Sequence, residues 1–420
     1  MSDTFYHNLP NGVQIVHRKT TSPVVYVGIM VGAGTRHELP NENGMAHYIE
    51  HCVFKGTEHY TARQIINHIE GIGGEINAYT TKEETTFYAA TLNNHFRTTL
   101  HLLADMVLRP TFNKKETDKE VTVILDEIES YNDSPSELIY DDFENMIFEG
   151  SSLAMPILGT KKTLRRISKS PDIALNWMKT HYRPERMVLF VQGNVSTKQV
   201  ITAAEKELLA SSPIACSEAS YSSLCERPIG LCPSYSPSGA SRTYRRHTHQ
   251  THVMLGSHTY PIGHPKQLTM FLLNNILGGG SMSSRLYLSL REKYGLVYNI
   301  DSQAVPLSDT GYWNIYLACE PQHKDQCIEL CHKELTQLRD TRLTATQLQR
   351  ALRQLEGQLA ISAENQENNA LAMAKQMLYH HRAPQWQETF AKVQKITSEQ
   401  LQEVANEVFA PEKIYTLLYD

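Results

Sequence analysis

Hydrophobic and polar positions change their period repeatedly along the chain, which predicts a mixture of strands and helices. Runs rich in β-branched residues predict strands, and apolar positions that recur every three to four residues predict helices. The predicted strands are 12–18, 23–33, a pair within 75–92, 186–195, 250–260, a pair within 297–319, and the segment KIYTLLYD. The predicted helices are 44–56, 61–70, 93–110, 113–130, several within 134–182, 197–209, 264–277, 283–294, and several within 323–408.

The predicted elements follow a similar order in two halves, which are separated by a segment of different composition. Residues 211–243 are rich in Ser and Pro and have no sustained period, as is typical of a linker that runs along the surface. We therefore predict an α+β protein of two similar domains, each a mostly antiparallel β-sheet with helices packed against it. The predicted boundaries are 1–210 for the first domain and 244–420 for the second, with 211–243 between them.

Composition narrows the class of protein. With 420 residues, 41% hydrophobic and 20% charged, the chain has ample material for buried cores and differs from disordered or fibrous proteins. The 40 basic and 45 acidic residues give a net charge of −5, which argues against a sequence-independent nucleic-acid binder. Seven cysteines, an odd number without a CxxC pair, favour reduced thiols.

The cellular location is predicted from the absence of a membrane-span pattern and of a targeting peptide. No run approaches the roughly 18 consecutive apolar residues of a membrane span. The first residues, MSDTFYHNLPNGVQIVH, have neither the basic and apolar regions of a signal peptide nor the Arg-rich character of a transit peptide. We expect a cytoplasmic protein with no membrane partner.

The segment GMAHYIEHCVFKGT contains the most informative local pattern. His47 and His51 are four residues apart, and Glu50 follows His47 by three, so a helix projects all three from one face. Two imidazoles at this spacing can hold a zinc ion, and the carboxylate lies close enough to activate a water molecule. The order H-x-x-E-H is the inverted zinc-peptidase motif. A helix with two surface histidines and a glutamate is the alternative.

A catalytic zinc site also needs a third protein ligand and one open position. The segment KKETDKEVTVILDEIES offers Glu127, and Glu120 precedes it by two helical turns on the same face. Glu120 could then orient one of the zinc histidines as a hydrogen-bond acceptor. Taken without the first motif, a solvated acidic helix face is the simpler interpretation.

Together these motifs resemble the pitrilysin/insulinase superfamily of inverzincin metallopeptidases, in particular its short-chain branch, similar to mitochondrial processing peptidase and its bacterial relatives. The segments that carry the resemblance are GTRHE (34–38), NENGMAHYIEHCVFKGT (41–57), GGEINAYTTKEETTFY (73–88), MPILGT (155–160), Tyr182 to Gly193, and LGGGSMSSRLYLSLREKYGLVY (277–298). The resemblance implies a zinc-dependent endopeptidase for peptides or unfolded segments. It implies one zinc per chain, bound by His47, His51 and Glu127. By the same resemblance Glu50 is the general base and Glu120 the supporting carboxylate.

The second half carries another motif of the family, a glycine-rich loop followed by an Arg and a Tyr. Here these are Gly278, Gly279 and Gly280, with Arg291 and Tyr298. An Arg can donate to peptide carbonyls, and a Tyr hydroxyl can stabilise a developing oxyanion or hold the substrate. The loop lacks the Gly-Lys-Ser/Thr that follows in a phosphate-binding loop, so nucleotide binding is disfavoured.

The segment from Glu75 to Thr80 resembles the substrate-binding edge strand of the family, which implies that Asn77, Ala78 and Tyr79 bind substrate. An exposed sheet edge offers unpaired N–H and C=O groups to an extended peptide. Without the resemblance, an ordinary inner strand is an equal alternative.

The resemblance also implies a clamshell of four such domains, of which this chain supplies half. We therefore expect a homodimer in which the partner provides Arg291 and Tyr298 to each zinc. A heterodimer with an inactive homologue is the alternative. For function, the alternatives are a non-catalytic scaffold or assembly subunit of the same fold and a processing subunit that needs a different partner chain.

Two weaker patterns have simpler interpretations. His247, His249 and His252 could form a second metal site, but solvated histidines near the start of a strand are favoured. Cys327 and Cys331 could form a metal or redox pair on a helix, but packed thiols are favoured.

Overall fold

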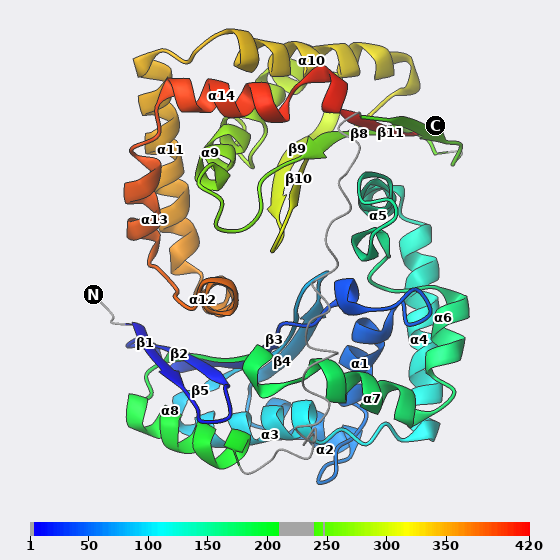
Figure 1. The fold of residues 1–420 in the computed structure, drawn as a ribbon, viewed down its shortest axis with the longest axis vertical. Coiled ribbons are helices and arrows are strands. Elements are labelled where there is room, and N and C mark those ends of the chain that lie inside the picture. Colours follow the sequence, from blue (N-terminus) through cyan, green and yellow to red (C-terminus); the bar gives the residue numbers. More distant parts are fainter. Residues whose placement is uncertain (1–3, 210–238, 247) are drawn as a thin grey trace. The chain divides into compact units, whose positions relative to one another are not determined.

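The computed structural model describes residues 4–209, 239–246 and 248–420 (Figure 1). These residues form two compact units, and each unit combines three stretches of the chain. The first unit draws on Met1–Glu129, Met155–Gly230 and Ala363–Pro384, and the second on Ser130–Ala154, Leu231–Ser362 and Gln385–Asp420. The units therefore do not follow the contiguous ranges 1–210 and 244–420. As boundaries of sequence domains, those ranges stay a prediction.

The first unit is built on a six-stranded sheet in the order β1-β2-β6-β3-β5-β4. Its strands are β1 (Thr4–Asn8), β2 (Gln14–Lys19), β3 (Val24–Val31), β4 (Glu75–Thr80), β5 (Thr85–Leu92) and β6 (Met187–Gly193). Strands β2 and β6 are parallel, and the other neighbours are antiparallel. Its helices include α1 (Met45–Val53), α2 (Ala62–Glu70), α3 (Phe96–Leu108), most of α4 (Lys114–Asn132), α6 (Lys161–Ile167), α7 (Pro171–His181), α8 (Thr197–Ala204) and α12 (Gln366–His380).

The second unit repeats this topology with one strand fewer, in the order β7-β11-β8-β10-β9. Its strands are β7 (Ser241–Tyr244), β8 (Thr251–His258), β9 (Val297–Pro306), β10 (Gly311–Cys319) and β11 (Tyr415–Tyr419). Here β7 and β11 are the parallel pair, and the other neighbours are antiparallel. Its helices include α5 (Pro135–Ile147), α9 (Gln267–Leu277), the π-helical turn Tyr287–Lys293, α10 (Lys324–Asp340), α11 (Ala345–Glu364), α13 (Trp386–Val393) and α14 (Ser398–Val408). The predicted α+β class with two similar sheets is confirmed.

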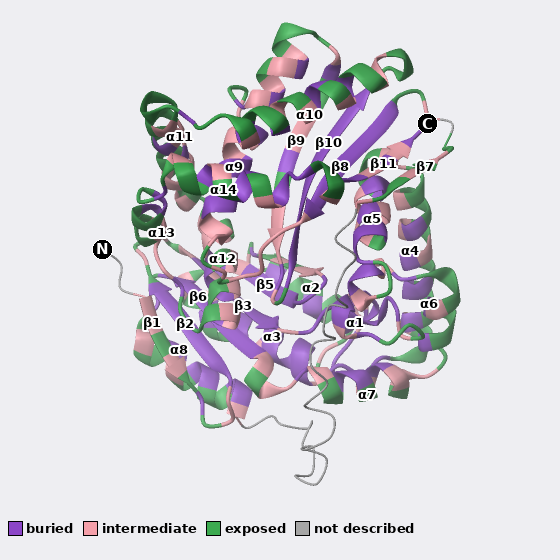
Figure 2. Ribbon diagram, turned by 45° about the horizontal axis from the view of Figure 1, so that its top comes forward, coloured by how far each residue is buried: buried purple, intermediate pink, exposed green. Residues whose placement is uncertain are grey.

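Both faces of each sheet are covered by helices. One helix in each unit comes from the other half of the sequence: α12 packs on the first sheet and α5 on the second. Central strands β6 and β10 are consequently buried along their whole length, as Figure 2 shows. This explains why MVLFVQG reads as an almost continuous apolar run rather than an alternating one.

Two short edge strands differ from the sequence prediction. Strand β1 was not predicted, and β7 begins inside the predicted linker, at Ser241. Neither strand has a fully buried position, so neither shows a hydrophobic pattern that marks a strand. Residues 211–238 of the predicted linker lie outside the described residues. None of the described helices is long and apolar enough to cross a membrane.

The start of helix α1 is fixed by a glycine and a buried carboxylate. Gly44 has a φ of 91°, and a Cβ added to it would lie 2.9 Å from the Cα of Gly159. The Glu38 side chain is 4% exposed and accepts the N–H groups of Gly44 and Ala46, each at 2.8 Å. Burial raises the pKa of Glu38 to about 8, although these N–H groups favour its charged form. Glu38 thus caps a helix whose own N-cap residue has no side chain.

Gly44→Ala should therefore destabilise the first unit more than the same substitution at a glycine that has a similar positive φ but no close neighbours. Gly73 is a matched control, because it has a φ of +75° and an added Cβ would meet nothing within 4 Å. We expect Gly73→Ala to lower the free energy of unfolding by about 1–2 kcal/mol. Gly44→Ala should cost about 1–3 kcal/mol more, because the methyl group collides with backbone. Urea unfolding measures both, and equal losses would contradict the close packing at Gly44.

Candidate metal centre

Helix α1 and helix α4 bring three metal-ligand side chains together in the first unit. The rings of His47 and His51 have centroids 4.5 Å apart on α1. Glu127 reaches them from α4, with its Oε2 3.8 Å from Nε2 of His47 and 3.5 Å from Nε2 of His51. One ligand atom from each residue lies within 4.8 Å of the others, and no other group in the described part of the chain meets this condition.

Glu120, on α4, contacts the candidate ligand His51 and connects the two helices. Its Oε1 is 2.9 Å from Nδ1 of His51, and its Oε2 is 2.7 Å from Nζ of Lys55. Because a carboxylate only accepts, His51 donates through Nδ1, which leaves the lone pair of Nε2 free to bind a metal. The structure therefore places Glu120 where it can support His51. Lys55 is a partner that the sequence analysis did not single out.

The two histidines have different proton affinities. Burial, together with the nearby His51, lowers the pKa of His47 to about 4, so its imidazole is neutral near pH 7. Burial also acts to lower the pKa of His51, but hydrogen bonds and charge interactions with Glu127 and Glu120 outweigh it and raise that pKa. Without a cation, Glu127 and Glu120 therefore favour the protonated form of His51.

Glu50 projects from the same helix and is held by the neighbouring strand. Its Oε2 accepts a hydrogen bond from the Thr80 hydroxyl at 2.6 Å. Burial raises the pKa of Glu50, and the bond from Thr80 opposes that rise. A carboxylate with a raised pKa close to candidate metal ligands has the properties of a general base. Thr80 belongs to a segment quoted in the sequence analysis, but no role was assigned to it.

The donor set and its charge fit a zinc ion. Two imidazole nitrogens and one carboxylate oxygen are the ligand types of catalytic zinc sites, which keep a fourth position open. Glu50, Glu120 and Glu127 are three acidic side chains, and Lys55 is a basic partner of Glu120. The group therefore has an excess of acidic side chains that a divalent cation would offset.

Strand β4, which contains Asn77, Ala78 and Tyr79, lies at the edge of the first sheet. It pairs only with β5 among the described strands, so its other side offers free backbone groups. The Ala78 N–H is bonded to the Asn77 side chain at 2.8 Å. The alternative of an inner strand is excluded.

The other predicted site residues lie in the second unit. Gly278 ends helix α9, and a Cβ there would lie 2.6 Å from the Ser302 side chain. Tyr298 is the second residue of edge strand β9 and is 74% exposed. The Arg291 guanidinium lies 5.3 Å from the Tyr298 ring centroid and 4.9 Å from that of Tyr287. Arg291 and Tyr298 are therefore neighbours, and Gly279 and Gly280 continue the loop after α9.

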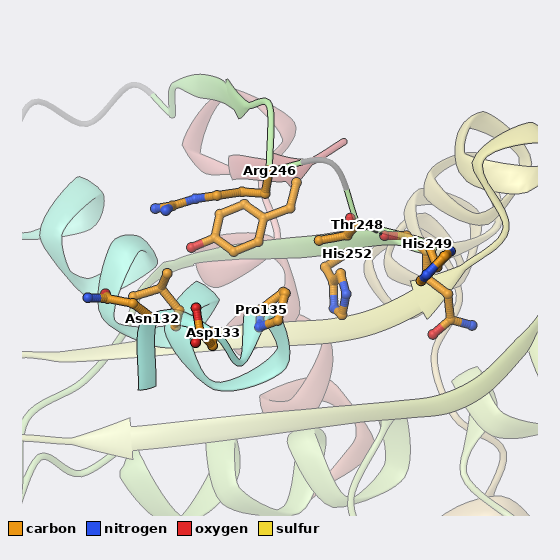
Figure 3. A pocket seen from close by; sticks show the side chains of 10 residues that line it. Asn132, Asp133, Pro135, Arg246, Thr248, His249 and His252 are labelled. Carbon is orange, nitrogen blue, oxygen red and sulfur yellow. Dashed lines mark hydrogen bonds between the residues drawn. The ribbon is translucent and has the colours of Figure 1, made fainter. Parts of the chain in front are cut away.

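The weaker sequence patterns show no metal-ligand geometry among the described residues. His249 and His252 line a pocket of about 420 Å³ in the second unit (Figure 3). His252 Nδ1 is 3.0 Å from the Tyr316 hydroxyl. His247 lies outside the described residues. Cys327 and Cys331 are buried free thiols.

Comparisons with known proteins agree with this fold. Residues 14–161 match the family model described as insulinase (peptidase family M16), and residues 170–355 match the peptidase M16 inactive domain. An uncharacterized zinc protease of Bacillus subtilis is 32% identical, over 97% of this chain and 96% of its own length. An uncharacterized zinc protease of Streptomyces coelicolor is 30% identical, over 95% of this chain and 86% of its own. The chain is a member of the insulinase family of peptidases, M16.

More distant relatives share the architecture. The beta subunit of the mitochondrial-processing peptidase of Pongo abelii is 25% identical, over 94% of this chain and 80% of its own length. The crystal structure of a protease from Helicobacter pylori superposes with a TM-score of 0.88 at 19% identity, covering 100% of this chain and 99% of that one. The family and the names of these relatives support a protease and imply zinc.

In the metal-free protein, His51 should take up a proton at a higher pH than His47. At about pH 5.5 we expect a charged His51 and a neutral His47, because carboxylates face His51 while burial dominates at His47. Nitrogen NMR of the histidines in metal-stripped protein measures both titrations. Glu120→Gln should lower the pKa of His51 and leave that of His47 nearly unchanged. A higher pKa for His47 than for His51 would contradict the geometry.

Proposed function

We propose that the chain is a zinc metalloendopeptidase that hydrolyses peptides or unfolded segments. The observation that carries this proposal is the convergence of His47, His51 and Glu127 on one point, with Glu50 close enough to interact with His51 and Glu127. These residues come from two helices that Glu120 connects through its contacts with His51 and Lys55. One zinc per chain would be held by His47, His51 and Glu127.

The chain's own residues supply the acid–base steps. A zinc ion bound here would act as a Lewis acid for a water molecule and for the scissile carbonyl. Glu50 takes the proton of the attacking water and passes it to the leaving amine. Glu120 accepts the Nδ1 proton of His51 and so keeps the ring in one orientation.

The substrate would bind as an added strand along β4. Backbone pairing gives affinity for many sequences, and nearby side chains give choice. Asn77, Ala78 and Tyr79 would line this edge. Pairing requires the Ala78 N–H to exchange its bond to the Asn77 side chain for one to the peptide.

We further propose a homodimer in which each chain supplies Arg291, Tyr298 and the loop Gly278–Gly280 to the zinc of its partner. The exposure of Tyr298 and its contact with Arg291 support this role, because both groups are available to an incoming peptide. Arg291 would donate to peptide carbonyls, and the Tyr298 hydroxyl would stabilise the developing oxyanion.

Glu50→Gln should retain zinc and lose turnover. Glutamine keeps the hydrogen bond from Thr80 but cannot take a proton, so we expect kcat on an unfolded peptide to fall by about 10²- to 10⁴-fold. Metal analysis should still find about one zinc per chain. Glu70→Gln, at an exposed position on α2, is the control and should keep wild-type activity.

Two results would count against this assignment. Wild-type turnover in Glu50→Gln would remove Glu50 as the base. Purified wild-type chain that holds no zinc and cleaves nothing would favour a scaffold subunit.

Mixing two inactive variants should restore activity if the site is shared between subunits. Glu50→Gln chains retain Tyr298, and Tyr298→Phe chains retain Glu50, so each mixed dimer contains one complete site. Random exchange should recover about one quarter of wild-type activity per chain, since half the dimers are mixed. The peptide assay on separate and mixed samples measures this. No recovery after verified subunit exchange would contradict the shared site.

A further inference from the structure

The backbone N–H and C=O groups of Thr80 lie on the unpaired edge of the first sheet. The Thr81 N–H donates to the Glu84 carbonyl at 2.8 Å, which makes these two residues a hydrogen-bonded pair. Bonded and non-bonded pairs alternate along an antiparallel ladder. Thr80, opposite Thr85, is therefore a non-bonded position, and its N–H and C=O point away from β5. A peptide paired with β4 would meet this backbone.

The side chain of the same residue holds Glu50. The Thr80 hydroxyl is 2.6 Å from Oε2 of Glu50 and 3.5 Å from the Thr85 hydroxyl, which itself donates to the Ala33 carbonyl at 2.9 Å. Thr80 has a single proton to donate, and the short bond to a carboxylate is the stronger one. Oε1 of Glu50 has no hydrogen-bond partner among the described residues, so it is the oxygen left for proton transfer.

The turn after Thr80 is anchored by residues 34–38. The Arg36 N–H donates to the Lys82 carbonyl at 2.8 Å, and the Thr35 N–H donates to the Thr81 carbonyl at 3.3 Å. The Arg36 guanidinium pairs with Glu83 at 2.6 Å, and both side chains are buried. The end of β4 therefore has little freedom to move relative to these residues.

The same segment also fixes helix α1, because Glu38 accepts the N–H groups of Gly44 and Ala46. Residues 34–38 thus join the start of the helix that carries Glu50 to the turn that follows Thr80. The motif GTRHE contributes to the sequence resemblance but has no chemical role in the proposed reaction. Its contacts connect the two elements that carry the Glu50 carboxylate and the Thr80 hydroxyl.

We propose that Thr80 is a positioning residue that couples the peptide-binding edge to the general base. Its backbone joins the edge that the peptide occupies, and its hydroxyl holds one oxygen of Glu50 so that the other faces the reacting water. This inference rests on the proposed peptidase function. It predicts that loss of the hydroxyl impairs turnover without impairing binding, because peptide pairing uses only the backbone.

The test compares Thr80→Val with Thr80→Ser in the purified full-length chain. Valine keeps the shape and the strand preference but removes the donor, whereas serine keeps the donor. We expect Thr80→Val to lower kcat by about 10- to 100-fold with KM within about twofold of wild type. Thr80→Ser should keep most of the activity. Zinc content, melting temperature and the affinity of metal-free protein for a fluorescent peptide should stay at wild-type values in both variants.

Thr259→Val is the matched control, since the Thr259 hydroxyl, in the second unit, is buried and has no hydrogen-bond partner among the described residues. It should leave kcat unchanged. Wild-type kcat in Thr80→Val would overturn the proposal, as would an equal loss in Thr80→Ser. A joint loss of zinc, melting temperature and activity would show a merely structural role and would also overturn it. Failure of the peptidase function itself is distinguishable, because the wild type and Thr259→Val would then also be inactive.

Discussion

The contact between Glu120 and the end of helix α1 is the constraint on which the site depends. Glu120 is only 6% exposed, and a buried carboxylate is costly unless its charge is compensated. His51 and Lys55 compensate it, one at each oxygen. Because these partners lie on or just after α1, they fix the position of α4 relative to that helix. Glu127, two turns further along α4, is thereby held beside the histidines.

Helix α1 has only nine residues and would not be stable alone in water. Its other face, which includes Met45, Ile49 and Val53, is buried in the core of the first unit, and Glu38 caps its start. The positions of His47, Glu50 and His51 are therefore consequences of core packing. Core packing fixes the orientation of this short helix, and the helix therefore holds the three polar side chains in defined directions.

The sequence predicted those parts of the site that depend on local spacing. Helix geometry alone places side chains at these spacings on one face. The sequence therefore predicts that His47 lies beside His51, and that Glu120 and Glu127 share a face. The edge position of β4 could not be read from its residues, since free and paired strands have the same alternation. The roles of Thr80 and Lys55 depend on contacts between separate elements. The exchange of α5 and α12 was missed for the same reason: an apolar helix face does not specify which sheet it covers.

The corresponding helix and edge strand of the second unit are also joined by a polar side chain. There, Asn274 on α9 donates to the Ser302 carbonyl at 3.0 Å and accepts the Ser302 hydroxyl at 2.6 Å. Ser302 lies on β9, the edge strand that corresponds to β4, and α9 follows β8 as α1 follows β3. In both units a polar side chain of this helix is thus tied to a hydroxyl of the edge strand. A neutral amide is cheap to bury but cannot take a proton, whereas a carboxylate can. A polar bond between this helix and the edge strand thus occurs in both units, and the acidic group, together with the ligands near it, gives the first unit its proposed chemistry.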